Sequence, residues 1–395
     1  MKQFVLVFLI FTSIAGHAQE QDSTFIKKDV KSTKFDFLFS YYQQDGNHSA
    51  VTGGEGTEKL DVFINKINIT HVIDSANTLY LEGGVDVISS ASTDRIDMNM
   101  SSASAVDSRL WVSAGYQYTA KSNRFSVGGK PSFSIESDYL SLGLSAWWMG
   151  HNDLNNWRYN VSGQFYSDDL RWGRLDEEQR APVTLVYPFE LRDSVWFDIY
   201  RRFSYNLTFD VQHDINKRMS IGVFPGLIYQ SGLLSTPFHR FYFKGETRAV
   251  VENLPRKRVK IPLGFQLNAF LGARTIIRLY YRYYWDDFGI EAHTLSLETP
   301  IKLLPQLVFT PFVRFYTQNQ ADYFYPYQTA DPAVSFFTSD YDLSGFSSFK
   351  YGAGLKFMSI KGGWYKQFGL RYAHYKRSDG LYFNQLTSYL SVPSK

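Results

Sequence analysis

Two arginines on one face of a predicted strand, Arg278 and Arg282, are the residues whose type and spacing most clearly indicate chemistry. They lie in the stretch RTIIRLYYRYYWDD, where every second side chain from Ile277 to Trp285 is apolar or aromatic. Side chains two residues apart share a face of a β-strand, so one face is hydrophobic and the other is positively charged. A soluble sheet would turn the apolar face to a packed core. A membrane barrel would turn it to lipid and turn the arginines to a watery lumen.

The same alternation in other segments collects charged residues on one inner face. An arginine at the bilayer midplane on the lipid side would cost about 2–4 kcal/mol, so we place these residues inside. The positive charges exceed the negative ones, and a water-filled pore of this kind would favour anions. The alternative is that the charges pair across strands and make the wall rigid. The predicted lumen-facing residues are Lys130, Arg158, Arg278, Arg282, Arg314, Lys350, Lys356, Arg371, Glu82, Asp86, Asp210 and Glu298.

Nucleophilic catalysis is the second kind of chemistry to consider, and the sequence does not support it. His293 and Ser296 are near neighbours, but an offset of three residues puts them on opposite faces of a strand. The chain has no cysteine, which excludes thiolate nucleophiles and thiolate metal sites. We therefore predict no catalytic residue, no cofactor and no enzyme activity, and keep a barrel-embedded hydrolase only as an alternative.

The stretch from Asp45 to Gly56 is rich in glycine and contains acids and His48. Calcium prefers several carboxylate and carbonyl oxygens, so this stretch is a candidate Ca²⁺ or ligand loop. The spacing of its acids does not match an EF-hand. We interpret it as a turn-rich loop, whose glycines permit tight bends, and predict no metal site.

Sixteen segments with period-two alternation supply the elements that would position the charged residues. Each is close to the length that a tilted membrane-spanning strand needs. We expect bulges at Pro131, Pro225 and Pro311, because proline removes a hydrogen-bond donor from the sheet. The predicted strands are 34–42, 59–70, 78–88, 108–119, 123–135, 139–149, 156–167, 203–213, 219–230, 258–271, 274–286, 290–301, 306–317, 347–358, 365–376 and 381–391.

The connectors between these segments sort by length. Those after even-numbered strands are all short, and the long ones all follow odd-numbered strands. Outer-membrane barrels show this pattern because their outer loops are long and their periplasmic turns short. The sequence thus predicts an all-β protein: one closed antiparallel transmembrane barrel of about 16 strands, within a range of about 14–18. The predicted long outer loops are 43–58, 89–107, 168–202, 231–257 and 318–346.

The N-terminus and the composition indicate where such a barrel would lie. Residues 1–18 have a lysine, an apolar run and small residues before Gln19, as in a cleaved signal peptide. Residues 19–33 are polar and are interpreted as a flexible periplasmic lead, so the barrel domain spans 34–391. Aromatic residues make up 17% of the chain, as expected for interfacial girdles. A net charge of +3 argues against binding to nucleic acid. We therefore expect outer-membrane lipids as the surroundings.

Several stretches resemble a family of Gram-negative outer-membrane barrels that is classed as a domain of unknown function. They include DGNHSAVTGGEGTEKL at 45–60, GGVDVISSASTDRID at 83–97 and YRYYWDDFGIEAHTL at 281–295. RFYTQNQADYF at 314–324 and TSDYDLSGFSSFKYG at 338–352 are similar as well. The resemblance implies a barrel in the outer membrane, and it implies no activity and no site residue.

Two functions of different kinds are consistent with these observations. The first is a porin-like channel that passes small solutes with a mild preference for anions. The second is a closed structural or docking barrel whose loops or lead bind other envelope proteins. Ion conductance in a planar bilayer would separate them.

Overall fold

The computed structural model describes residues 31–90, 106–122, 124–136, 139–170, 200–236, 239–359 and 365–393. Residues Lys31–Lys395 form one compact unit, and it is this unit that is described below. The predicted signal peptide, nearly all of the predicted lead and most of the predicted loops 89–107 and 168–202 lie outside the described residues. Among the described residues, no helix is long and apolar enough to cross a membrane.

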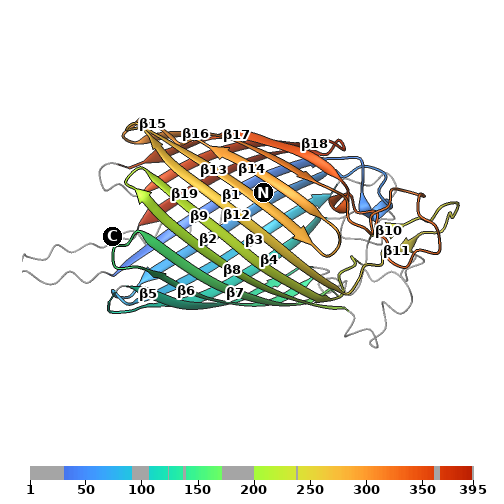
Figure 1. Cartoon of the computed structure of the whole chain (residues 1–395), viewed down its shortest axis with the longest axis horizontal. Helices are drawn as coiled ribbons and strands as arrows, with labels where there is room; N and C mark the ends of the chain where they lie inside the picture. The colour runs from blue at the N-terminus through green and yellow to red at the C-terminus, as the bar shows by residue number, and fades with distance from the viewer. Residues whose placement is uncertain are drawn as a thin grey trace, which may run out of the picture. The chain divides into compact units, whose positions relative to one another are not determined.

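The described chain is almost entirely β-structure (Figure 1). Two 3₁₀ turns, η2 (Ala50–Thr52) and η6 (Tyr341–Leu343), lie in its connectors. The strands are β1 (Ser32–Asp45), β2 (Leu60–Val72), β3 (Asn77–Ser90), β4 (Val106–Thr119), β5 (Phe125–Ile135), β6 (Leu140–His151), β7 (Trp157–Asp169), β8 (Arg201–Asn216), β9 (Met219–Gly232), β10 (Arg240–Phe241), β11 (Val250–Val251), β12 (Lys257–Leu271), β13 (Thr275–Asp286), β14 (Glu291–Glu298), β15 (Ile301–Leu304), β16 (Leu307–Gln318), β17 (Phe346–Met358), β18 (Gln367–Arg377) and β19 (Tyr382–Pro393).

The main sheet closes on itself as an antiparallel barrel. Successive strands pair with each other, and β1 pairs with β19 along its length, for example Phe37 opposite Leu390. β14 and β15 both pair with β16 and are two pieces of one strand, interrupted at Thr299 and Pro300. Counted this way, the 17 segments of the sheet make sixteen positions, as predicted. Every predicted strand overlaps an observed one, although β1 begins at Ser32, inside the predicted lead.

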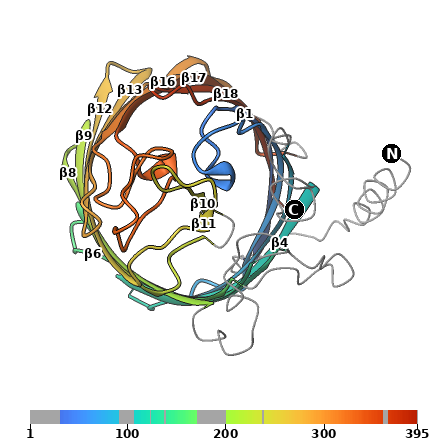
Figure 2. The same ribbon diagram turned by 90° about the vertical axis from the view of Figure 1, so that its right-hand side faces the viewer.

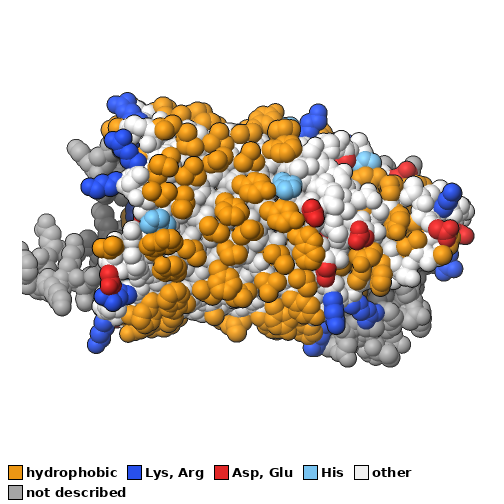
Figure 3. Space-filling model, in the orientation of Figure 1, with side chains coloured by type: hydrophobic (Ala, Val, Ile, Leu, Met, Phe, Trp, Pro, Cys, Tyr) orange, Lys and Arg blue, Asp and Glu red, His pale blue; other side chains and the backbone are white. Residues whose placement is uncertain are grey.

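Exposed apolar side chains come from strands all round the barrel, and they form a broad band on the face drawn in Figure 3. Leu81, Leu144 and Leu297 are 47%, 56% and 38% exposed, because each occupies the outward position in its strand. The hydrophobic clusters that are buried in the described chain lie instead in and beside the connectors at one end. A barrel with this inverted distribution of apolar surface is suited to lipid and not to water. The structure is therefore a transmembrane β-barrel.

The sheet accommodates its prolines without the bulges that the sequence led us to expect. Near Pro131 the pairing of β4 with β5 is interrupted between Ser113↔Ser132 and Tyr116↔Gly129, with equal numbers of residues on both strands. The pairing of β8 with β9 is interrupted in the same way near Pro225. Pro311 faces the gap between β14 and β15. The expected bulges are thus wrong, because the ladder tolerates a missing donor by leaving a local gap.

Three long connectors gather at the end of the barrel opposite Ser32 and Pro393, where the first strand begins and the last one ends: 46–59, 233–256 and 319–345. In the end view they lie within the ring of strands (Figure 2). They contact one another through the bridge between Asn253 and Phe337 and through Ser339 Oγ, which donates to the Arg240 carbonyl at 2.8 Å. We call this packed set of three connectors the outer cap.

Candidate functional site

Strands β13, β14 and β18 bring two arginines to one carboxylate on the inner wall. Arg278 is directly opposite Glu298, and its Nη1 donates to Oε1 at 3.0 Å. Both terminal nitrogens of Arg371 donate to Oε2 of the same carboxylate at 3.1 Å. The Arg371 guanidinium also lies 3.8 Å from the ring centre of Phe312, a cation–π distance. One acid therefore balances two bases at this point.

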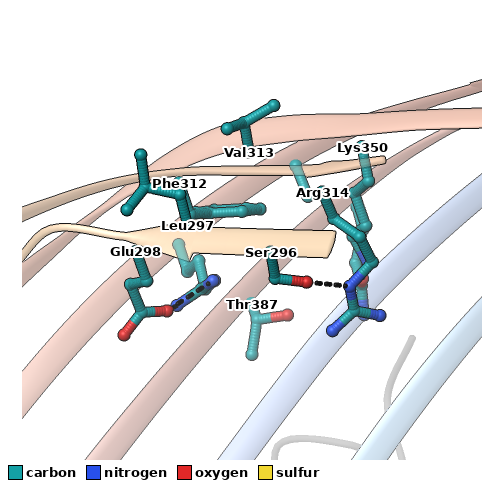
Figure 4. Close-up of a pocket in the computed structure, with 11 residues that line it drawn as sticks. Ser296, Leu297, Glu298, Phe312, Val313, Arg314, Lys350 and Thr387 are labelled. Carbon is teal, nitrogen blue, oxygen red and sulfur yellow. Dashed lines mark hydrogen bonds and ion pairs between the residues drawn. The ribbon is translucent and has the colours of Figure 1, made fainter. Parts of the chain in front are cut away.

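Arg314 on β16 and Lys350 on β17 are a second group on the same wall, and they are direct cross-strand partners. Arg314 Nε donates to Ser296 Oγ at 3.0 Å, and Lys350 Nζ donates to Gln385 Oε1 at 3.2 Å. Both acceptors are neutral. Figure 4 shows Arg314, Ser296 and Thr387 on one side of the sheet, while Val313 points to the other side.

Two more cations extend this wall toward both ends. Arg282 lies between Gly264 and Thr294 in the sheet, and Lys356 borders a cavity of about 440 Å³ that Arg278 and Arg371 also line. Within the described residues, the middle of the β13–β18 wall thus sets six cations against the single carboxylate of Glu298. We call this group the basic wall, and it comprises Arg278, Arg282, Arg314, Lys350, Lys356 and Arg371.

The opposite side of the barrel, β2–β8, carries acids as well as bases. Glu82 lies 3.4 Å from both Lys66 and Lys130. Asp86 is directly opposite Arg109. No hydrogen bond reaches Asp86 Oδ1 from a described residue, and Arg109 Nε donates to Ser134 Oγ instead. The Glu82 group joins strands β2, β3 and β5, as the rigid-wall alternative expects, and keeps one positive charge in excess.

Near the short turns, the charged side chains of the β2–β8 side have hydrogen-bond partners. Arg158 donates to both oxygens of Asp214, at 2.6 and 2.9 Å. Asp210 accepts from Asn160 Nδ2 at 2.7 Å. The excess of positive charge is therefore larger on the basic wall, where six cations accompany one acid, than on the β2–β8 side.

The inner wall borders open space. Arg278, Arg371 and Arg158 keep 46%, 41% and 43% of their side-chain surface accessible, although all three point inward. Side chains that filled the bore would bury one another below these values. A barrel of sixteen strands is also wide enough to leave an aqueous lumen.

The outer cap contains a buried polar cluster that sequence reasoning did not find. Thr338 Oγ1 donates to Glu252 Oε2 at 2.6 Å, and His239 Nδ1 is 3.3 Å from the same oxygen. Burial lowers the pKa of His239, but the charges of Glu252 and Asp340 outweigh it and raise that pKa to about 9. Burial raises the pKa of Asp340 to about 6. The protonated histidine thus joins two connectors.

A second polar cluster ties the cap to the turn between β18 and β19. Arg377 hydrogen-bonds Asp342 of one connector, Asp379 of the turn and the carbonyl of Tyr341. Glu58 lies nearby, and burial, together with the charge of Asp342, raises its pKa to about 7. The cap therefore carries a carboxyl group that titrates near neutral pH.

A third cluster anchors the short β13–β14 turn. The carboxylate of Asp286 is fully buried and accepts from the backbone N–H groups of Phe288 and Ile290 at 3.0 and 3.1 Å. Arg258 Nε donates to it at 3.1 Å and Tyr284 Oη at 2.6 Å. The sequence showed Asp286 only as the polar end of an alternating strand, because periodicity does not reveal that the N–H groups of the following turn and Arg258 of another strand converge on it.

The family model described as "Protein of unknown function (DUF3570)" matches residues 8–388. The chain belongs to this family. No curated protein matches it.

Solved structures similar to this DUF3570 chain include outer-membrane proteins. Pseudomonas aeruginosa OpdK with vanillate is 11% identical over 92% of this chain and 98% of that chain, with a TM-score of 0.42. A BenF-like porin from Pseudomonas fluorescens is 7% identical over 94% and 100%, with a TM-score of 0.44. A bacterial polysaccharide outer membrane secretin is 9% identical over 92% and 98%, with a TM-score of 0.49.

His293, Ser296 and His48, the candidates for catalysis and metal binding, do not come together in this DUF3570 barrel. Tyr281 Oη lies 2.8 Å from His293 Nδ1 on the lipid-facing side, whereas Ser296 faces the bore. His48 stacks on Tyr341 at 3.8 Å, so its loop packs into the cap. Within the part of the chain that the structure describes, no cluster of three potential ligands could hold a metal ion.

Proposed function

We propose that the barrel is a water-filled channel for small solutes with a mild preference for anions. The exposure of the inward-facing arginines is the observation that carries this proposal. If side chains filled the bore, the charged groups would contact only one another and stabilise the barrel wall. Accessible charged groups can instead interact with solutes that enter the bore. The outer face of apolar residues places that bore across a membrane.

The preference for anions is inferred from the basic wall. One uncompensated cation attracts a monovalent anion at about 6 Å by roughly 0.7 kcal/mol in water. Screening limits the range to about 8 Å at physiological salt. The basic wall has several such cations, while the β2–β8 side carries acids as well as bases. The expected result is a several-fold selectivity and not an absolute one.

Purified protein in a planar bilayer tests the proposal. In a KCl gradient we expect discrete conductance and a reversal potential that shows chloride to be favoured over potassium. The triple variant Arg314→Gln, Lys350→Gln, Lys356→Gln should show a weaker preference while it still conducts, because Arg278, Arg282 and Arg371 remain opposite the single acid Glu298. Lys66→Gln is the matched control, because Lys66 belongs to a paired group. Silence at all voltages, or a preference for potassium, would contradict the proposal.

The outer cap supports a second candidate, a barrel that is closed at its mouth and docks other envelope proteins. Two hydrophobic clusters, around Phe288 and Phe241, pack connectors 233–256 and 319–345 together, and His48 of the 46–59 connector stacks on Tyr341. A silent wild-type protein that begins to conduct after residues 326–336 are replaced by a short glycine-serine linker would favour this candidate. Loss of a bound envelope protein in the same variant would support docking, and unchanged capture would count against it.

A further inference from the structure

Arg314 and Lys350 are an unbalanced pair within the basic wall. They are directly opposite each other in the pairing of β16 with β17. Like charges in this position destabilise a sheet unless an acid lies between them. Glu298 supplies such an acid for Arg278 and Arg371. Among the described residues, Arg314 and Lys350 form no ion pair with a carboxylate, and their hydrogen-bond acceptors are Ser296 and Gln385.

Both cations retain donors that form no hydrogen bond with a described residue, although Lys350 Nζ also lies 5.0 Å from the ring centre of Phe383. Arg314 donates to Ser296 through Nε, and its two terminal nitrogens have no hydrogen bond to a described residue. Lys350 has three protons and donates one of them to Gln385. A guanidinium end with two parallel N–H groups matches the two oxygens of a carboxylate or phosphate, and the ammonium group adds a compact positive charge.

A cavity of about 140 Å³ adjoins these donors. Ser296, Arg314, Lys350, Gln385 and Thr387 contribute polar groups to its lining. A water molecule occupies roughly 30 Å³ in the liquid, so there is room for one oxyanion group and a few waters. Figure 4 shows Ser296 and Thr387 on the side of the sheet to which Arg314 points.

We propose that Arg314 and Lys350 form a binding station for the carboxylate or phosphate group of a small solute in the bore. The station rests on the proposed channel function and narrows its solutes to oxyanions. Arg371 does not complete it, because its charge is shared with Glu298 and it covers the ring of Phe312. Because the Arg371 guanidinium lies over the ring of Phe312, a solute cannot stack on that face of the ring. The station therefore recognises the charged group of a solute and not an aromatic ring.

Binding is measured first, without reference to conduction. Inorganic phosphate and acetate are titrated calorimetrically into the purified full-length protein in detergent, with uncharged acetamide as the neutral probe. Wild type should bind phosphate or acetate and not acetamide. The anion that binds with the higher affinity shows whether the station prefers a phosphate or a carboxylate group. Arg314→Gln should weaken binding about tenfold or more, the effect of losing a charge-assisted hydrogen bond. Lys66→Gln should change it by less than about twofold.

Lys350→Glu separates loss of the station from loss of folding. It converts the like-charged pair into an ion pair with Arg314, so we expect a raised midpoint of thermal unfolding together with loss of phosphate and acetate binding. Unchanged binding in this variant, or no binding of either anion to wild type, would overturn the station.

The bilayer experiment keeps the two proposals apart. An anion-preferring current from a protein that binds neither phosphate nor acetate would overturn the station and leave the channel. Binding by a protein that passes no current would overturn the channel and leave the station.

Discussion

Replacing Glu58 with glutamine should stabilise the outer cap at pH 8 and have a much smaller effect at pH 5. Glu58 lies in the 46–59 connector, where its N–H donates to the Gly46 carbonyl at 2.9 Å. Burial and the nearby charges of Asp342, Asp340 and Asp379 raise the pKa of Glu58 from 4.5 to about 7, although Arg377 opposes them. Above that pH the folded cap must hold a charged carboxylate that it disfavours.

The magnitude follows from the pKa difference between the folded and unfolded connector. The folded state binds the proton more tightly, so this contribution to stability is complete below pH 4.5 and is lost as pH rises through about 7. Each pKa unit corresponds to about 1.4 kcal/mol, which gives about 2–3 kcal/mol after allowance for partial contact with solvent. Glutamine is neutral at every pH and avoids the loss.

Hydrogen–deuterium exchange of the connector's amides measures the effect. When Glu58→Gln and wild type are compared at the same pH, exchange at pH 8 should be about 30- to 150-fold slower in the variant, and only about fourfold slower at pH 5, where the carboxyl of the unfolded connector is already partly ionised. Glu246→Gln is the control, since Glu246 is exposed in another connector. The same ratio at both pH values for Glu58→Gln would refute the reasoning, because only titration of this carboxyl makes the ratio depend on pH.

Two further substitutions test the anchor and the lipid face. Asp286→Ala leaves Arg258 and two buried N–H groups without their acceptor, so we expect a loss of about 3–5 kcal/mol in urea unfolding. Leu144→Arg puts a charge on the lipid face in the middle of β6, so folding into lipid vesicles should be less favourable by about 2–4 kcal/mol. Channel selectivity should stay constant from pH 6 to 8, because the arginines of the basic wall keep their charge; a shift in reversal potential would contradict this.

The barrel itself was predictable from the sequence because its cause is local. Alternation places Leu279 and Tyr281 outward and Arg278 and Arg282 inward, and the same rule applies to every strand in which one face meets lipid. A register slip of one residue would move all of these side chains to the wrong face. Sixteen strand positions and their order follow from that rule and from connector lengths.

The cap was not predictable in this way because its contacts join residues that are far apart in the chain. Glu252 meets Thr338, and Arg377 meets Asp342, without any periodic pattern in either connector. The predicted inner-face list likewise could not show that Glu298 serves two arginines while Arg314 and Lys350 have no acid. Both facts depend on which strands become neighbours around the barrel.

The positive excess of the basic wall comes from where the charged residues lie in the barrel, and not from an excess of basic residues in the chain. The chain carries 41 basic and 38 acidic residues, which is close to balance. The acids that would neutralise Arg314 and Lys350 lie elsewhere, in the β2–β8 wall and in the outer cap, where Glu82, Glu252 and Asp342 meet bases of their own. Separating charges in this way costs electrostatic energy that a purely structural barrel would avoid by alternating signs around its circumference. This distribution of charge is what the proposed anion-preferring channel requires, because cations gathered on one side of a bore raise the local concentration of anions.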